Sequence, residues 1–239
     1  MACRDTYKTT ACNNFITGNK IITENVVNEN VDRLLFGVDS YYPANDLLQN
    51  NINQFEWVVR NKIYPNFYGR NINGENCLTC EEITFLHDKG CKIAAIYSSK
   101  DEKQTEEQGC QIAKIICTRA KSLCIPFGVA VFLEVCDCEK ITGSFIKGYT
   151  EAMITEGYTP AFKVNTDAKY NFDREFSSCA NYCKEPLKKC LIWAIEPTVK
   201  EYNGITTSHL IHPDKWSPYA PSSIRRNEIA IWQYGRECH

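Results

Sequence analysis

The chain has 239 residues, of which 44% are hydrophobic and 23% are charged. This is the composition of an ordinary globular protein with one large domain or two small ones. Its 27 basic and 29 acidic side chains nearly balance and form no basic run, which argues against nucleic acid as a partner. No apolar run reaches the roughly 18 residues of a membrane span, and the opening MACRDTYKTT lacks the apolar segment of a signal peptide.

Cysteine is the compositional anomaly, with 14 residues. In an oxidising location the even number could pair in disulfides, whereas in a reducing one most would be small buried hydrophobic residues. Cys77 and Cys80 have the spacing of a zinc knuckle, but no second pair follows, so we expect no metal and no other cofactor. Cys3, Cys12 and Cys238 lie near the termini, which makes them our candidates for disulfides between subunits of a homo-oligomer.

Regular elements begin after a polar extension, residues 1–32, in which only residues 19–27 resemble a strand. The patterns predict seven strands, at residues 33–39, 66–70, 91–98, 128–135, 159–165, 189–197 and 228–235. They predict helices between these strands, at residues 44–63, 78–90, 106–124, 142–157 and 173–183. The second helix has a full start and stop signature, with Thr79 as N-cap, Glu82 as capping-box partner and Gly90 as the stop.

This regular alternation indicates a parallel sheet with right-handed crossovers. With so many units, a TIM-like α/β barrel over residues 33–239 is favoured over an open sheet. Because only about seven strands are evident, we leave open whether the barrel is complete. Either residues 200–227 or the segment KIITENVV near the N-terminus closes it, or it stays open.

Barrels of this kind carry their active sites at the carboxyl ends of the strands. Polar and aromatic residues gather at the predicted ends: Asp39, Tyr41, Tyr42, Arg70, Tyr97, Glu134, Asp137, Trp193, Trp232 and Tyr234. A rim of tyrosine and tryptophan around acids suits carbohydrate, because sugar rings offer C–H faces to aromatic rings and hydroxyls to carboxylates. The chemistry indicated is acid–base cleavage of a glycosidic bond, which uses two carboxylates about 5 to 9 Å apart. Asp39, Glu134 and Asp137 are the candidate catalytic acids, and the other seven residues are candidate substrate contacts.

Several blocks between residues 35 and 236 resemble, in order, the glycoside-hydrolase-like domain of unknown function that is related to family-25 lysozymes. They are FGVDSYYPAN, NFYGRNIN, LTCEEITFLHDKGCKIAAIY, LCIPFGVAVFLEV, FIKGYTEAMITEGYTPAF, LIWAIEP and IAIWQYGR. The resemblance implies a TIM-like barrel in which such lysozymes cleave peptidoglycan with an Asp after strand one and an acid-x-acid pair after strand four. Asp39 matches the first position.

The pair after strand four departs from that pattern. Glu134 falls on the first acid, but Cys136 stands where the proton-donating Glu is expected, and a thiol cannot protonate such a leaving group near neutral pH. A slip of one residue would bring in Asp137, although strand alternation would then turn it to the opposite side. The family's final Asp, after the WQYG-like strand, is also missing before the chain finishes with RECH.

Two hypotheses follow. The first is a barrel related to cell-wall glycan of the peptidoglycan type, with reduced or no hydrolysis, in which Asp39 orients the sugar or its attacking water. The second is an inactive structural protein of a cell or spore surface, cross-linked through its cysteines. Both favour an extracellular or surface location despite the lack of a visible signal peptide, with cell-wall glycan as the partner in the first and none in the second.

Overall fold

A computed structural model describes residues 35–48, 51–61, 63–136, 140–196 and 215–235. Seven strands form one parallel sheet in the order of the chain, each paired with its neighbours in sequence. They are β1 (Gly37–Ser40), β2 (Phe67–Asn71), β3 (Lys92–Ser98), β4 (Ala130–Val135), β5 (Thr159–Val164), β6 (Leu191–Ala194) and β7 (Ile231–Trp232).

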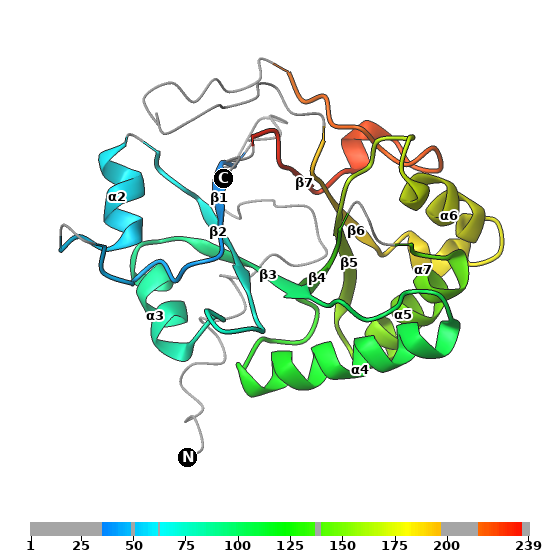
Figure 1. Ribbon diagram of the computed structural model, residues 1–239, viewed down its shortest axis with the longest axis horizontal. Helices are drawn as coiled ribbons and strands as arrows, with labels where there is room; N and C mark the ends of the chain where they lie inside the picture. Colours follow the sequence, from blue (N-terminus) through cyan, green and yellow to red (C-terminus); the bar gives the residue numbers. More distant parts are fainter. Residues whose placement is uncertain (1–34, 49–50, 62, 137–139, 197–214, 236–239) are drawn as a thin grey trace, which may run out of the picture.

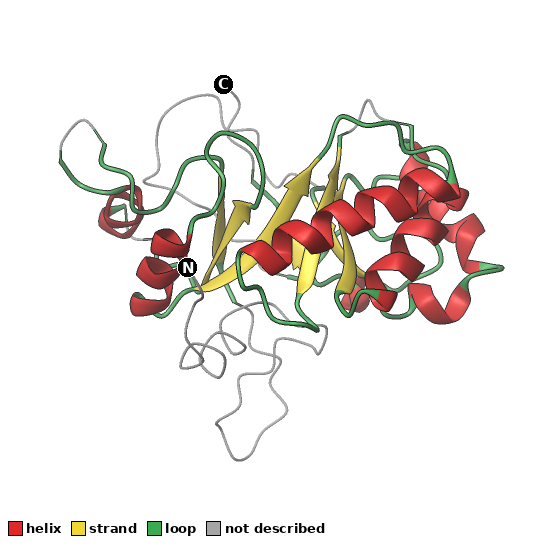
Figure 2. Ribbon diagram, turned by 90° about the horizontal axis from the view of Figure 1, so that it is seen from below, coloured by secondary structure: helices red, strands yellow, loops and turns green. Residues whose placement is uncertain are grey.

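The sheet curls into a half-barrel with its helices on the outer side (Figure 1). Figure 2 shows the strands running toward a common edge, as parallel connections require. The predicted TIM-like α/β fold with seven strands is therefore confirmed, in an incomplete form. Two segments were proposed to close the barrel. The N-terminal one lies outside the described residues, and so does the first part of the other, residues 200–214. Residues 215–227 contain no strand.

The helices follow the strands in the expected order. They are α2 (Gln54–Arg60), α3 (Cys80–Asp88), α4 (Glu106–Ser122), α5 (Gly143–Thr155), α6 (Asn171–Ala180) and α7 (Lys184–Leu187), followed by the short 3₁₀ helix η3 (Arg226–Glu228). Thr79 caps α3 as predicted, since its hydroxyl accepts a hydrogen bond from the backbone N–H of Glu82. Among the described helices, none has both the length and the apolar character needed to cross a bilayer.

The helix predicted over residues 44–63 is wrong in its first half. Asn51 adopts a left-handed conformation, with φ of 58°, and the backbone N–H of Leu48 donates to the carbonyl of Ile52 across a tight turn. Asparagine tolerates this conformation better than most residues. The helix begins only after Asn53, whose side chain accepts from the N–H of Glu56 at 2.8 Å.

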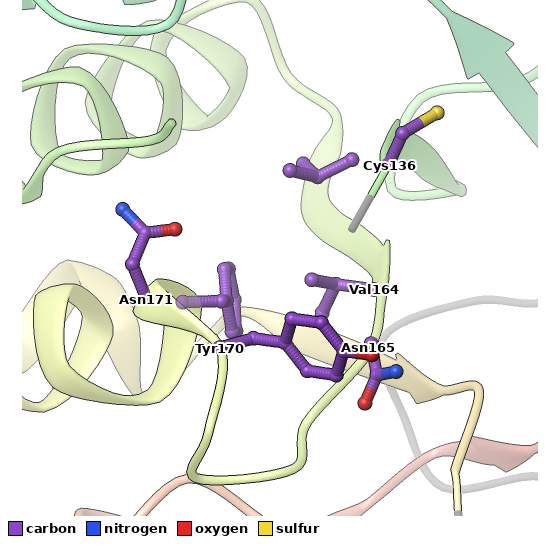
Figure 3. Close-up of a pocket in the computed structure, with 7 residues that line it drawn as sticks. Cys136, Val164, Asn165, Tyr170 and Asn171 are labelled. Atoms are coloured by element: carbon purple, nitrogen blue, oxygen red, sulfur yellow. The ribbon is translucent and has the colours of Figure 1, made fainter. Parts of the chain in front are cut away.

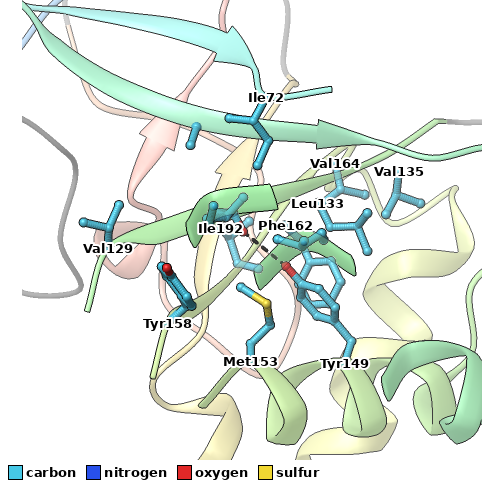
Figure 4. Packing of buried hydrophobic residues seen from close by; sticks show 14 of the residues in the cluster. Ile72, Val129, Leu133, Val135, Tyr149, Met153, Tyr158, Phe162, Val164 and Ile192 are labelled. Atoms are coloured by element: carbon cyan, nitrogen blue, oxygen red, sulfur yellow. Dashed lines mark hydrogen bonds between the residues drawn. The ribbon is translucent and has the colours of Figure 1, made fainter. Parts of the chain in front are cut away.

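The main hydrophobic core lies between the outer face of the sheet and the helices (Figure 4). Tyr149 of α5 is fully buried there, with its hydroxyl 3.1 Å from the carbonyl of Val131 and 3.2 Å from that of Ala161. This contact joins a helix to two neighbouring strands. Because side chains alternate between the faces of a strand, every second residue of the same strands points the other way, into the curl.

A smaller apolar cluster fills the inner face of the curl. Trp193 is its largest member and packs edge-to-face against Phe67 and Phe132, with ring centroids 6.5 and 5.5 Å away. Gly69 gives this indole its space, because a Cβ there would lie 2.6 Å from Trp193 Cη2 and 3.1 Å from Asp39 Oδ1. The tryptophan thus forms an apolar floor beneath the polar residues described next.

Candidate functional site

A row of polar side chains crosses the inner face near the carboxyl ends of the strands. Ser98 of β3, Glu134 of β4, Lys163 of β5 and Trp193 of β6 are consecutive partners in the strand register. Since register partners share a face of the sheet, all four side chains belong to the inner side. The strand register therefore places Glu134 next to Lys163, and Lys163 next to Trp193 of the apolar floor.

Lys163 is the centre of this row. Its Nζ lies 2.9 Å from Glu134 Oε1 on the neighbouring strand and 2.5 Å from Asp39 Oδ2 on β1. The lysine side chain is only 8% exposed, whereas the two carboxylates are 21% and 26% exposed. The contact with Asp39 joins residues 124 positions apart and spans the interior of the curl. Its Nζ also lies 5.1 Å from the centre of the Trp193 ring, a cation–π distance.

The second oxygen of Glu134 is also occupied. Ser98 Oγ donates to Glu134 Oε2 at 2.5 Å and lies 3.3 Å from Asn71 Oδ1. Both oxygens of this carboxylate therefore have partners within the protein. Asp39, Asn71, Ser98, Glu134 and Lys163 form what we call the interior polar cluster.

The charge state of Lys163 decides what this cluster can do. Burial lowers the pKa of the ammonium, but Asp39 and Glu134 more than offset that effect and raise it above its usual 10.5. Lys163 is therefore a cation at neutral pH and lacks the free electron pair of a nucleophilic amine. A general acid must give a proton to the leaving group, whereas both acids here form ion pairs with the Lys163 ammonium. These ion pairs disfavour both nucleophilic and general-acid catalysis by the cluster.

The raised pKa of Lys163 predicts an alkaline limit to stability. Below pH 10.5 the lysine is protonated whether folded or unfolded, so the contribution of the ion pairs is complete; it is lost as the pH rises through the higher folded value. In urea titrations from about pH 9 to about pH 11, the wild type should lose more unfolding free energy than Lys163→Met, which lacks the linked group. Equal losses would show that Lys163 is not linked to alkaline unfolding.

Arg70 is not at the rim where the sequence placed it as a substrate contact. Its side chain is fully buried beside the β1–α2 loop and makes an ion pair with Glu82 at 2.7 Å. It also donates to the backbone carbonyls of Ser40, Tyr41 and Asn76. These partners are all internal, so the guanidinium holds backbone in place rather than facing a ligand. The carboxylate of Glu82 was expected to complete a capping box, but it pairs with Arg70 instead.

The predicted aromatic contacts divide by exposure. Tyr41 and Tyr42 are 54% and 60% exposed on the β1–α2 loop. Trp232 is buried and packs edge-to-face against Tyr234, with ring centroids 5.6 Å apart. Tyr97 packs against the outer core instead, because it lies one residue before Ser98 and alternation turns it toward the helices. Among the predicted aromatic contacts in the described segments, the two loop tyrosines are the strongly exposed ones.

Cys136, aligned with the missing proton donor, stands directly after the end of β4. It lines a small cavity with Val135, Val164, Asn165 and Tyr170, beside the start of α6 (Figure 3). The cavity volume of about 10 Å³ corresponds to about one water molecule, and its lining contains residues of the outer face.

The remaining candidates fall largely outside what the structure describes. Asp137, Cys3, Cys12 and Cys238 all belong to undescribed segments. Ten cysteines lie in the described segments, and no disulfide joins any of them. Within those same segments, no group of three or more His, Cys, Asp or Glu residues is arranged to hold a metal ion.

Lys163, Ser98 and Asn71 are cluster members that the sequence analysis did not single out. The signal for Lys163 was present in TPAFKVN, where one lysine stands between Phe162 and Val164 in a strand that otherwise looks buried. Lysine is almost never buried without a partner, so an acid on a neighbouring strand could have been expected. Ser98 and Asn71 carried no comparable signal, because small polar residues at strand ends are common.

No protein-family model and no curated protein matches the chain. Among solved structures, an uncharacterized protein from B. stearothermophilus is similar over 85% of this chain and 91% of its own, with 23% identity and a TM-score of 0.70. Two structures of the modular autolysin LytC from Streptococcus pneumoniae each match 73% of this chain and 41% of their own. The structure at 1.6 Å has 11% identity and a TM-score of 0.44. The complex with a synthetic peptidoglycan ligand has 12% identity and a TM-score of 0.42.

D-psicose 3-epimerase from Clostridium cellulolyticum H10 matches 67% of this chain and 63% of its own, with 7% identity and a TM-score of 0.41. The similarity to the B. stearothermophilus protein establishes a shared fold. The similarities to the autolysin and the epimerase, with TM-scores below 0.5, establish neither fold nor function for this chain.

Proposed function

We propose that this protein binds a cell-wall glycan of the peptidoglycan type at the carboxyl ends of its strands, without cleaving it. The observation that carries the proposal is the ammonium of Lys163, shared between Asp39 and Glu134. The choice of glycan follows the resemblance of the sequence blocks to glycoside-hydrolase-like domains. The ion pairs favour a binding site over a hydrolytic one.

Hydrolysis is disfavoured by the geometry of the site as well as by its charges. Glycosidases place the scissile bond between two carboxyl groups, about 5 to 5.5 Å apart in retaining enzymes and about 6.5 to 9.5 Å apart in inverting ones. Here the space between Asp39 and Glu134 is occupied by Lys163 Nζ, within hydrogen-bonding distance of both. A sugar oxygen cannot take that position unless the lysine side chain, which is only 8% exposed, moves away.

The features that favour glycan binding are the partly exposed polar groups and the loop tyrosines. Asp39 and Glu134 keep about a fifth and a quarter of their side chains exposed, which leaves them able to accept from sugar hydroxyls. Tyr41 and Tyr42 follow Asp39 within three residues, so an aromatic surface lies close to the polar one. A sugar needs both kinds of contact.

The test measures binding and cleavage on the same material. Wild-type protein should sediment with purified peptidoglycan and bind its soluble oligosaccharides in calorimetry, with no release of new reducing ends. Tyr42→Ala should weaken binding about tenfold, the scale of one lost aromatic contact. The matched control is Tyr64→Ala, which removes another exposed tyrosine, 69% exposed, at the opposite end of the strands, before β2, and should leave affinity unchanged.

Two results would contradict the proposal. Release of reducing ends that disappears in Asp39→Asn would show a working hydrolase, with Lys163 displaced in the active form. Failure of the wild type to bind either insoluble or soluble peptidoglycan would remove this glycan as the ligand.

A further inference from the structure

The buried pair of Arg70 and Glu82 has more hydrogen bonds than an isolated ion pair needs. Arg70 Nε lies 2.7 Å from Glu82 Oε1, and Nη2 lies 3.1 Å from Oε2, so the contact is bidentate. Both side chains are completely buried. Replacing such a pair with apolar side chains is often neutral or even stabilising, so stability alone does not account for it.

Three other bonds of the pair reach one loop, residues 40–44, and a fourth joins Arg70 Nη2 to the carbonyl of Asn76 at 2.7 Å. Arg70 Nη1 donates to the carbonyl of Ser40 at 2.6 Å and to that of Tyr41 at 2.9 Å. At the far end of the loop, Glu82 Oε1 accepts from the N–H of Ala44 at 2.7 Å. The ion pair thus holds the loop at both ends, through backbone atoms that no side-chain substitution within the loop would remove.

A second set of bonds fixes the middle of the same loop. Ser40 Oγ accepts from Gln54 Nε2 at 2.6 Å and from the N–H of Tyr42 at 3.1 Å. The rings of Tyr41 and Tyr42 stand edge-to-face, 5.4 Å apart at 86°, and more than half of each residue is exposed. The loop therefore has a fixed backbone below and two large aromatic surfaces above.

We infer that Arg70 and Glu82 are positioning residues that hold Tyr41 and Tyr42 as a preformed platform for a sugar ring of the bound glycan. The inference rests on the proposed function for its ligand, and on the loop contacts for its mechanism. A platform that is ordered before binding loses little conformational entropy when the ligand arrives. The ligand is accordingly an oligosaccharide, with one ring on the platform and another at the interior polar cluster.

The experiment replaces the pair as a unit, in Arg70→Met/Glu82→Leu. This double variant should remain folded, because similar apolar side chains fill the same space. Hydrogen exchange at the amides of Tyr42 and Ala44 should become about a hundredfold faster, as expected for opening of a local unit whose anchors are lost. Affinity for a peptidoglycan oligosaccharide should fall about tenfold, while affinity for a single sugar should change less because it can occupy the interior polar cluster alone.

The matched control is Tyr149→Phe, which removes buried hydrogen bonds to strand carbonyls in the outer core, far from the loop. It should leave loop exchange and affinity unchanged even where it lowers the melting temperature. Gln54→Ala is the milder second variant, because it removes only the donor to Ser40 Oγ. It should raise hydrogen exchange at the amide of Tyr42 about threefold. This keeps the clamp, our name for the hydrogen bonds that hold residues 40–44, testable if the double variant fails to fold.

The outcomes separate the inference from the proposed function. Unchanged exchange in the double variant and in Gln54→Ala would overturn the clamp, whatever the ligand. Faster exchange with unchanged oligosaccharide affinity would overturn the platform and leave the proposed function standing. If wild-type protein binds no peptidoglycan, the proposed function fails and the platform loses its ligand, while the exchange rates still report whether the clamp exists.

Discussion

Lys163→Met should lower the free energy of unfolding by about 3 kcal/mol, at the low end of the cost of breaking a buried ion pair, because the two acids are partly exposed. The methionine fills much of the same volume, so the loss comes from leaving Asp39 and Glu134 together without their cation. Urea denaturation at neutral pH measures the change.

Lys147→Met is the matched control. Lys147 also contacts two carboxylates, Glu106 and Glu151, but on the helix surface, with 28% of its own side chain and 43% or more of theirs exposed. Surface pairs contribute about 0 to 1 kcal/mol, so this variant should differ little from wild type. An equally small effect of Lys163→Met would mean that water screens the interior polar cluster, and it would contradict the role of these ion pairs in disfavouring hydrolysis.

Trp193→Ala should cost about 4 kcal/mol, the range of large-to-small changes at well-packed aromatic residues. The indole is 2% exposed and contacts Phe67 and Phe132 on two other strands, so its removal leaves a cavity under Lys163. Trp57→Ala is the control, because Trp57 of α2 is 37% exposed. Its loss should cost no more than about 1 kcal/mol.

The same variant tests where the glycan lies. The sequence analysis named Trp193 as a substrate contact, but the structure places it as the floor of the interior. We therefore expect stability and affinity to fall together in Trp193→Ala, because the floor supports the polar residues above it. A variant that kept wild-type stability while losing glycan binding would restore Trp193 to the role of a ligand contact.

The periodicity of the sequence was sufficient for the architecture. Strands alternating with helices at regular spacing imply a parallel, sequentially ordered sheet, and all seven predicted strands are present. The positions of Asp39 and Glu134 near strand ends also followed from pattern alone, since carboxyl ends of parallel strands meet at one edge. Their catalytic or binding role stays a prediction.

What the sequence could not give was pairing between distant segments. Arg70 looked like a rim residue because it stands near the end of β2, but alternation turns it away from the interior, toward Glu82 of α3. Lys163 looked like part of a strand, although its partners come from β1 and β4. The error in the helix over residues 44–63 has a local cause: the apolar spacing was helical, but Asn51 took the left-handed conformation that breaks it.

The contact between Asp39 and Lys163 bears on how the chain is made. On the ribosome β1 to β4 emerge first, and until β5 follows, Asp39 and Glu134 have no cation between them. Newly made chains that stop before residue 159 should therefore hold two like charges in the same interior and remain open to proteases. We therefore expect the two halves of the sheet to fold as one cooperative unit, because the ion pairs that join them need residues from both.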